Sequence, residues 1–319
     1  MSHDLNGWTP IRASYDGAGL VVDWCFTEGI AFDDPFFDQT VERCLRHPFR
    51  LLFRRTTPIE ALGELAIARG RPLPSGLVLH LSRSGSTLVA QMLARRPDTH
   101  VISEAGPLDA VIRAPAPMER RAEWLRWMAA ALNEPDGARP HYVLKLDAWA
   151  ALDLPLLALA FPGVPWAFVY RDPVEVLVSQ QRRPGYHMMP FGLPPSAVGL
   201  DPQVAAGMSI VEHGAAVLGR IATCVTAAAD DPLALLVNYD ELPAATVDRI
   251  ARHFGMPVDG TFRATMLEAV HNHVKNGVLP FADDRVTKQQ AAGDDLRAAA
   301  ERWVVEPYRK LERIRTGNR

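Results

Sequence analysis

After residue 76, short apolar runs alternate with longer stretches in which apolar and polar residues mix. Each run is bounded by polar or turn residues, which is typical of a buried strand. These runs lie at 77–81, 143–146, 166–170 and 235–237. The stretches 87–94 and 119–132 predict helices, and Trp124 and Trp127 on the second are expected in the core. Strands that alternate with helices predict an α/β fold, with a central parallel sheet flanked by helices in three layers.

The first quarter of the chain, residues 1–75, follows a different pattern. Residues 32–37 read as a turn with aromatic anchors, and residues 39–46 predict a short helix. The proline-containing stretch 71–76 then leads into the first apolar run. We expect residues 1–75 to form an accessory segment packed on a nucleotide-binding core of residues 76–319, where it helps to shape an acceptor pocket.

The sequence SRSGST follows the first apolar run and precedes the first predicted helix. Gly85 lets the backbone approach an anion closely, and the amides that open the helix present the positive end of its dipole. Ser84, Ser86 and Thr87 add hydroxyl donors, and Arg83 adds a permanent charge. A nucleoside triphosphate loop would carry a lysine after the glycine, and none follows here. The turn predicts a phosphate cradle; the alternative is an ordinary strand-to-helix turn.

A second strand-to-helix transition places Arg171 at the end of an apolar run. Asp172 is a good N-cap, Pro173 suits the first helical position, and Glu175 has the spacing of a capping box. Nearly two helical turns later, the hydroxyl of Ser179 is expected to face the same side as the Arg171 guanidinium. Arginine offers a bidentate fork to a phosphate, and serine offers a neutral donor beside it.

Together the two transitions resemble the nucleotide-binding motifs of the sulfotransferase superfamily, whose members use 3′-phosphoadenosine 5′-phosphosulfate as donor. The SRSGST turn resembles the family's 5′-phosphosulfate loop in its arginine form, as in tyrosylprotein sulfotransferases and many bacterial relatives. Arg171 and Ser179 are eight residues apart, as in the family's 3′-phosphate motif. The resemblance implies a P-loop-like three-layer fold and a donor site formed by both motifs.

Three further segments resemble parts of the family's donor site. Lys145, at the end of a short apolar run, is similar to the lysine that contacts the bridging oxygen of the donor; the alternative is a surface lysine whose ammonium stays in water. Tyr239 is similar to the tyrosine that packs near the adenine; otherwise its segment is a strand that ends in an acidic turn. Lys275 lies in HNHVKNG, which is similar to the late segment that closes over the nucleotide but is less basic and lacks its second glycine.

Glu104 follows a short apolar segment, where the tyrosylprotein and bacterial branch has a glutamate that serves as catalytic base. The resemblance therefore implies that Glu104 accepts the proton of the acceptor, while Arg83 and Lys145 stabilise charge on the leaving group. A carboxylate at a strand end also serves as a cap or ion-pair partner. The cytosolic branch uses a histidine, so His100 and His141 are competing candidates for the base.

The composition agrees with an enzyme that has a large core, since the chain has 319 residues and 48% of them are hydrophobic. A net charge of -3 gives no reason to expect a nucleic-acid or membrane partner. Three widely spaced cysteines favour a reducing compartment, and the N-terminus lacks the pattern of a secretory signal. The apolar stretch 148–170 contains Asp153 and three prolines, which argues against a membrane span. We expect a cytoplasmic protein of bacterial type.

The resulting hypothesis is in-line transfer of a sulfuryl group to a hydroxyl or amine of a small-molecule or peptide acceptor. No metal is expected, because a sulfuryl group carries less charge than a phosphoryl group and because His271 and His273 have no third ligand at a suitable spacing. One alternative is a P-loop kinase or phosphotransferase that uses a nucleoside triphosphate, although the loop lysine is missing. Another is a non-catalytic nucleotide-binding module. Acceptor pockets are built from variable loops, so the acceptor stays open, as does the oligomeric state.

Overall fold

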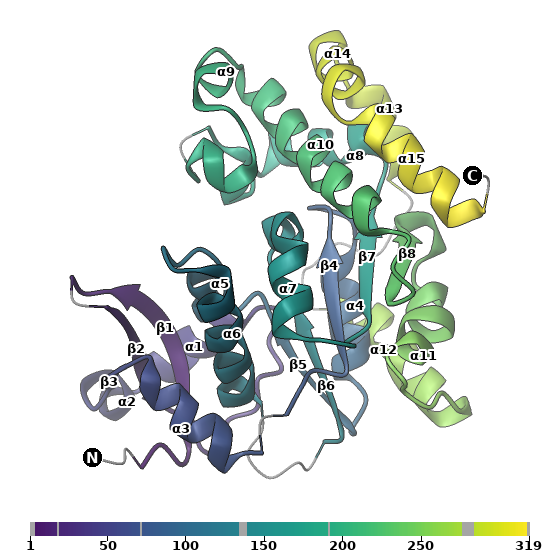
Figure 1. The fold of residues 1–319 in the computed structure, drawn as a ribbon. Coiled ribbons are helices and arrows are strands. Elements are labelled where there is room, and N and C mark those ends of the chain that lie inside the picture. Colours follow the sequence, from purple (N-terminus) through teal and green to yellow (C-terminus); the bar gives the residue numbers. More distant parts are fainter. Residues whose placement is uncertain are drawn as a thin grey trace.

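The computed structural model describes residues 4–17, 19–70, 72–133, 139–190, 192–275 and 284–317. Its main body is a parallel five-stranded sheet in the order β5-β6-β4-β7-β8, with helices on both faces (Figure 1). The strands are β4 (Gly76–His80), β5 (Thr99–Ser103), β6 (His141–Lys145), β7 (Trp166–Tyr170) and β8 (Ala234–Asn238). The predicted α/β fold with a central parallel sheet between helices is confirmed.

The two faces of the sheet bury alternate side chains of the same strands. In β4, Leu77 and Leu79 belong to one hydrophobic cluster and Val78 belongs to the other. Because both faces are covered, the strands read as continuous apolar runs. One face is covered by α6 (Met118–Leu132), α7 (Leu154–Ala160) and α10 (Ile210–Ala228), and the other by α4 (Ser86–Ala94), α11 (Ala251–His253) and α12 (Gly260–Lys275) (Figure 1).

The order of the strands reverses at β4. The chain leaves β4 for the outer strand β5, returns to β6 beside β4, and then crosses β4 to continue with β7 and β8. In open α/β sheets, ligands bind at the carboxyl edge where such a reversal separates the loops. The residues that directly follow the strands share this edge, and they include the SRSGST turn, Glu104, Arg171 and Tyr239.

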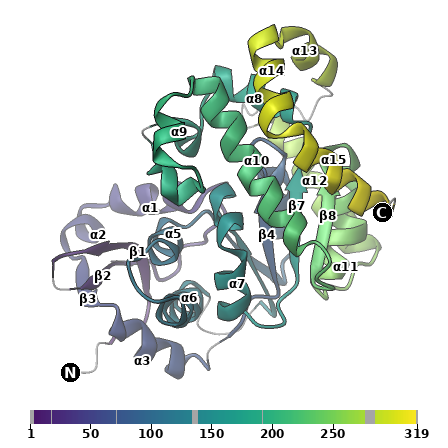
Figure 2. The ribbon, with the colours of Figure 1, turned by 45° about the horizontal axis from the view of Figure 1, so that its top comes forward.

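The first quarter of the chain forms a three-stranded antiparallel sheet that the sequence analysis did not predict. Its strands are β1 (Trp8–Tyr15), β2 (Leu20–Phe26) and β3 (Arg55–Pro58). It lies beside α6 and α5 (Gly106–Ile112), and its buried residues join the cluster on that face of the main sheet (Figure 2). The indole of Trp24 is fully buried and donates to the Thr57 hydroxyl at 2.9 Å. The predicted helix at 39–46 is confirmed as α1 (Phe37–Leu45).

The remaining helices connect these elements or close the chain. They are α2 (Pro48–Leu52), α3 (Glu60–Ala68), α8 (Pro173–Arg182), α9 (Pro202–Ala206), α13 (Arg285–Ala291), α14 (Asp294–Trp303) and α15 (Val305–Thr316). Within the described ranges, α10 has the length and mean hydropathy, 1.2, of a membrane span. However, 61% of that window is buried inside the protein, as in a core helix.

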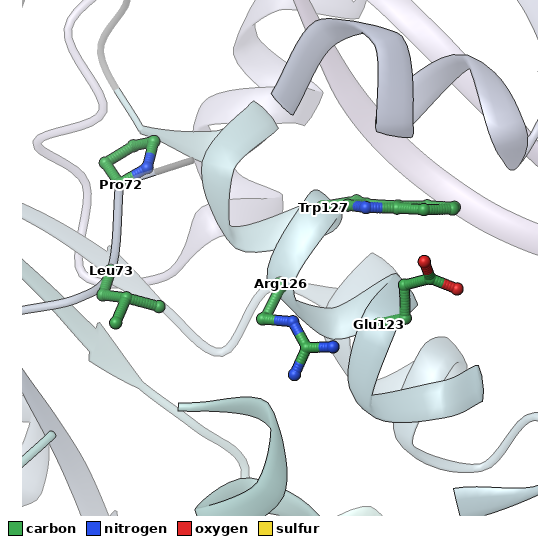
Figure 3. A pocket seen from close by; sticks show the side chains of 5 residues that line it. All are labelled: Pro72, Leu73, Glu123, Arg126 and Trp127. Atoms are coloured by element: carbon green, nitrogen blue, oxygen red, sulfur yellow. The ribbon is translucent and has the colours of Figure 1, made fainter. Parts of the chain in front are cut away.

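Two pockets lie toward the amino ends of the strands. The smaller, about 80 Å³, is lined by Pro72, Leu73, Glu123, Arg126 and Trp127 (Figure 3). The larger, about 420 Å³, is mostly apolar and lies between α7 and α10, over the starts of β4 and β7. Neither pocket includes a residue of the carboxyl edge, where the predicted site residues gather.

The first residue of β4, Gly76, has no room for a side chain, because a Cβ would lie 2.3 Å from Cγ and Cδ1 of Phe254. Gly76→Ala is expected to lower the free energy of unfolding by about 1–3 kcal/mol, since an added carbon in a packed core forces the ring or the backbone to move. Denaturant unfolding followed by circular dichroism measures this loss. Gly260→Ala is the control, because a Cβ there meets nothing within 4 Å. An equal effect of the two substitutions would contradict the described packing.

Candidate functional site

The turn after β4 depends on Gly85. This residue caps α4 in the left-handed conformation, with a φ of 84°. A Cβ at this position would lie 2.8 Å from Cδ1 of Leu242 and 3.1 Å from Cδ2 of Tyr239. Backbone conformation and close packing therefore both require glycine. The turn and Tyr239, which are far apart in the sequence, are adjacent in space.

The hydroxyl groups of the turn divide into two sets. The Ser84 hydroxyl is buried and donates to the backbone carbonyl of Val169 at 2.8 Å, so it anchors the turn to β7. In the part of the chain that the structure describes, the hydroxyls of Ser86 and Thr87 make no hydrogen bond; both residues belong to the first turn of α4. The first amides of a helix have no acceptor within the helix. Hydroxyls and amides together form a cradle that can hold an anion.

Two charged residues of the site have strained backbones. Arg83, with a φ of 60°, and Glu104, with a φ of 52°, are the non-glycine residues with positive φ among the described residues. This conformation costs about 1–3 kcal/mol and is concentrated at active sites and ligand clamps. The Arg83 side chain is exposed and donates to the carbonyl of Arg183 at 2.6 Å. The strain thus marks two of the three positions for which the sequence predicted roles in chemistry.

Glu104 and Lys145 form an ion pair at the ends of β5 and β6. Lys145 is fully buried, and its ammonium donates to Oε1 of Glu104. The alternative of a lysine with its ammonium in water is therefore wrong. Nε2 of His80, the last residue of β4, lies 3.3 Å from the same oxygen. Burial alone would raise the pKa of Glu104, but the charge of Lys145 and the contact with His80 outweigh it and lower the pKa to about 2.

His80 is a neutral imidazole. Burial and the charge of Lys145 lower its pKa, and the contact with Glu104 only partly opposes them. Nε2 faces the carboxylate at 3.3 Å, but neither ring nitrogen makes a hydrogen bond with a described residue. His80 therefore lies against the carboxylate without adding a charge to the site.

Side chains from other segments surround this pair. The Trp149 indole donates to Oδ1 of Asp109 at 2.6 Å, and Arg113 pairs with the same carboxylate. The ring of His187 lies 4.9 Å from that of Trp149. The Lys145 ammonium stands 5.4 Å from the centre of the Phe36 ring. The N-terminal segment therefore reaches the site, and its role in shaping an acceptor pocket stays a prediction.

Arg171 has three neighbours at the end of β7. Its Nε donates to Glu175 at 2.6 Å, a terminal nitrogen donates to Asp284, and the guanidinium stacks over the Tyr239 ring at 3.8 Å. Arg171 is buried, whereas the Asp284 side chain is 44% exposed. Arg171, for which the sequence predicted a bidentate contact with a phosphate, is therefore bound to two carboxylates of the chain.

The helix that follows Arg171 begins as predicted, with one exception. Oδ1 of Asp172 accepts hydrogen bonds from the Val174 and Glu175 amides, which confirms the N-cap. The predicted capping box is wrong, because the Glu175 carboxylate binds the Arg171 guanidinium instead. A charge-assisted bond between buried partners is stronger than one to a helix-end amide. The Ser179 hydroxyl donates to the carbonyl of Glu175 at 3.0 Å.

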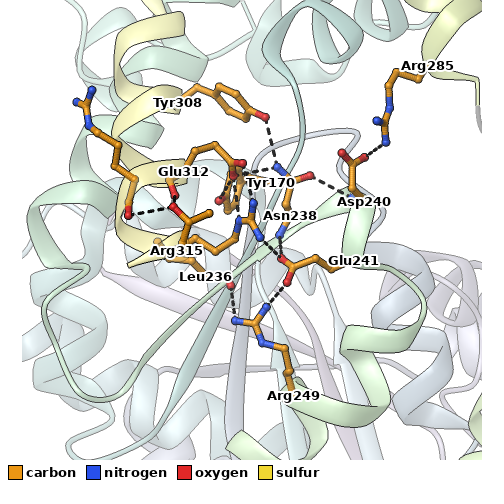
Figure 4. Close-up of polar contacts among 12 residues, drawn as sticks. Tyr170, Leu236, Asn238, Asp240, Glu241, Arg249, Arg285, Tyr308, Glu312 and Arg315 are labelled. Carbon is orange, nitrogen blue, oxygen red and sulfur yellow. Dashed lines mark hydrogen bonds and ion pairs between the residues drawn. The ribbon is translucent and has the colours of Figure 1, made fainter. Parts of the chain in front are cut away.

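A polar network fixes the ends of β7 and β8. Tyr170 and Asn238 are the last residues of these strands, and both donate to the carboxylate of Glu312 on α15 (Figure 4). The next residues along the two strands are Arg171 and Tyr239, which stack on one another. The C-terminal helix therefore positions two of the residues that the sequence associated with the nucleotide, Arg171 and Tyr239.

The competing histidines lie at the opposite edge of the sheet. Nε2 of His100 is 3.2 Å from the Leu132 carbonyl, and His141 pairs with Asp98 at 3.9 Å. Both stand near the amino ends of their strands. Since a strand rises about 3.3 Å per residue, they lie about 13 Å or more from Glu104 along the sheet, beyond reach of a proton there.

The remaining predicted residues lie at the end of α12 or directly after it. Lys275 is the last residue of α12, and its side chain lies outside the described residues, as do Gly277 and the side chains of His271 and His273. Within the described ranges, no group of three or more His, Cys, Asp or Glu residues is placed to hold a metal ion.

Sequence reasoning missed four side chains of the site, namely His80, Asp147, Trp149 and His187. His80 is the last residue of β4, and Asp147 and Trp149 closely follow the end of β6, so their position at the carboxyl edge could have identified them. His187 lies in the short 3₁₀ helix η2 (Tyr186–Met188), and no local pattern in the sequence places it beside Trp149.

Comparisons with known proteins bear on the fold of the chain. No family model and no curated protein matches the sequence. Among solved structures, sulfotransferase STF9 from Mycobacterium avium is 14% identical, with a TM-score of 0.50 over 76% of this chain and 80% of that chain. The sulfotransferase domain from the curacin biosynthetic pathway is 15% identical, with a TM-score of 0.44 over 77% of this chain and 98% of that chain. At this identity the first likeness shows the fold alone, so we conclude that the chain has the sulfotransferase fold.

Proposed function

We propose that the protein transfers a sulfuryl group from 3′-phosphoadenosine 5′-phosphosulfate to a hydroxyl or amine of an acceptor. The observation that carries the proposal is the meeting of an anion cradle with the buried Glu104–Lys145 pair at one edge of the sheet. A group that takes a proton and cations that stabilise a leaving group are what acyl, phosphoryl or sulfuryl transfer requires. The shared fold and the two sequence motifs favour the sulfuryl donor among these.

The residues present suit both ends of the donor. The first turn of α4, with Ser86 and Thr87, offers amides and unpaired hydroxyls to the 5′-phosphosulfate, and Arg83 adds a charge beside them. Arg171 and Ser179 would hold the 3′-phosphate. Tyr239 would pack near the adenine, and Lys275 stays a predicted contact. A phosphate would have to displace the Asp284 carboxylate from Arg171, and its greater charge favours that exchange.

The donor supplies an electrophilic sulfur joined to a phosphate leaving group. Glu104 accepts the proton of the acceptor as the new bond to sulfur forms. Lys145 and Arg83 stabilise the negative charge that the phosphate oxygen gains as the old bond to sulfur breaks. These roles need no metal ion, since the cations belong to the protein.

A carboxylate with a pKa of about 2 is a weak base near neutral pH, so Glu104 needs activation. The charge of Lys145 is the largest single cause that lowers this pKa. If the ammonium turns toward the phosphate of a bound donor, Glu104 loses this partner in a buried setting and its pKa rises. The pair therefore couples donor binding to the strength of the base, while His80 keeps the carboxylate in place.

The role of Glu104 predicts a specific loss of turnover. Glu104→Gln preserves shape but removes the base, so turnover is expected to fall about a hundredfold to ten-thousandfold. Affinity for adenosine 3′,5′-bisphosphate should stay the same or increase, because Lys145 loses its competing carboxylate. Product formation is measured by mass spectrometry and affinity by calorimetry. His141→Ala is the control, since this residue lies at the far edge of the sheet. Near-normal turnover of Glu104→Gln, together with an inactive His141→Ala or His100→Ala, would assign the base to a histidine.

The role of Arg171 predicts that the 3′-phosphate discriminates between nucleotides. Loss of one charge-assisted contact is worth about 1.5–3 kcal/mol, so Arg171→Ala should weaken adenosine 3′,5′-bisphosphate about tenfold to a hundredfold and leave adenosine 5′-monophosphate nearly unchanged. Asp284→Asn removes the competing carboxylate and should tighten the bisphosphate. Calorimetry on the three proteins measures all these affinities. Equal binding of both nucleotides to the unmodified protein, or tighter binding of ATP with magnesium, would instead support the phosphotransferase alternative.

A further inference from the structure

The acidic side chains near Glu104 outnumber the cations that pair with them. Glu104 pairs with Lys145, and Asp109 pairs with Arg113 at 2.6 Å. Asp147 and Asp38 have no ion pair or side-chain hydrogen bond in the part of the chain that the structure describes, although both lie close enough to Glu104 for its charge to act on them. Two carboxyl groups beside the proposed base are therefore without a partner.

Asp147 stands where a side chain ordinarily caps a helix, but it does not do so. It is the N-cap of the 3₁₀ helix η1 (Ala148–Asp153), and its carboxyl group accepts no cap hydrogen bond. The charged groups that face it are two acids, Glu104 and Asp109, and two cations, Lys145 and Arg113. Burial and then the two acids raise the pKa of Asp147 to about 8, since both cations already serve the other carboxylates.

Asp38 brings a second carboxyl group from the N-terminal segment. It lies in the first turn of α1 and is exposed at the edge of the site. Its Oδ1 is 4.0 Å from the position of a Cβ on Gly106, two residues after Glu104. Burial of part of the side chain, with the charges of Glu42 and Glu104, raises its pKa above the ordinary value.

A buried histidine gives independent evidence of a ligand in this region. The His187 side chain is only 4% exposed, yet neither of its ring nitrogens has a hydrogen-bond partner among the described residues. Its ring packs against Trp149, and His80, Glu104, Arg83 and Arg113 all act on its charge. Buried polar atoms nearly always have partners, so these nitrogens indicate a polar group that is supplied from outside the chain.

We propose that the acceptor is a cation, with an ammonium or guanidinium group that binds to Asp147 and Asp38 while its reacting hydroxyl or amine meets Glu104. This inference rests on the proposed function and names the substrate class of the same site. The rings of Phe36 and Trp149 add favourable surfaces for a cation. An anionic acceptor would meet two further carboxyl groups and is disfavoured.

Three phenols of matched shape test the proposal. They are tyramine, 4-ethylphenol and 3-(4-hydroxyphenyl)propanoate, which carry a positive, no and a negative charge. Calorimetry at about pH 8.5 with saturating adenosine 3′,5′-bisphosphate should show tyramine binding at least about tenfold more tightly than 4-ethylphenol, and the propanoate most weakly. Equal affinities, a preference for the neutral or anionic phenol, or no detectable binding of tyramine would overturn the proposal.

The pH dependence of tyramine affinity and two variants test whether Asp147 and Asp38 bind the cation. Because Asp147 ionises as the pH rises through about 8 and an alkyl ammonium stays charged to about pH 10, tyramine affinity should increase between about pH 6.5 and 8.5. Asp147→Asn should abolish this increase and most of the tenfold preference. Asp38→Asn, at an exposed position, should reduce the preference without affecting folding. Asp153→Asn is the matched control on η1 and should keep both properties; an equal loss in this control would contradict a specific role for Asp147.

Failure of this inference and failure of the proposed function give different results. If adenosine 3′,5′-bisphosphate does not bind, the proposed function fails, and the phenol series measured without nucleotide still decides whether the acidic site prefers a cation. If the bisphosphate binds and tyramine has no advantage over 4-ethylphenol, only the inference about the acceptor fails.

Discussion

The buried ion pair between Glu104 and Lys145 is the constraint on which the site depends. A lysine without solvent contact requires a carboxylate partner, because an unpaired charge in that position would be strongly destabilising. The pairing fixes the ends of β5 and β6, and the Glu104 amide also donates to the Lys145 carbonyl at 2.7 Å. The strained backbone of Glu104 is tolerated because these contacts and His80 hold the residue from several sides.

The two halves of the site have the same electrostatic design. We assign two buried cations to the donor. Lys145 is bound to the carboxylate of Glu104, and Arg171 is bound to the carboxylate of Asp284. In this arrangement the protein satisfies its own buried charges, and an anionic donor would exchange with the internal carboxylates. Exchange at Lys145 would free Glu104, the proposed base. Exchange at Arg171 would free Asp284, an exposed acid at the start of α13. Donor binding and preparation of the base would thus be one event.

Much of this fold follows from local patterns in the sequence. The short apolar runs predicted the parallel strands, and the Asp172 cap and the glycine of the turn follow from helix-end and backbone chemistry. The antiparallel sheet was missed because Pro10 and a shift of register before Arg12 interrupt the alternation in β1. No local spacing predicts that Glu175 binds Arg171 in place of the cap, or that Asp147 has no partner among the described residues. The approach of His187 to Trp149 depends on segments far apart in the sequence.

The coupling between the donor and Glu104 is the central claim, and a crystal structure with adenosine 3′,5′-bisphosphate tests it most directly. The account predicts the 5′-phosphate at the first turn of α4, the 3′-phosphate on Arg171 in place of Asp284, and the Lys145 ammonium on a phosphate oxygen and apart from Glu104. A nucleotide bound elsewhere, or one bound here with the Glu104–Lys145 pair intact, would contradict the account.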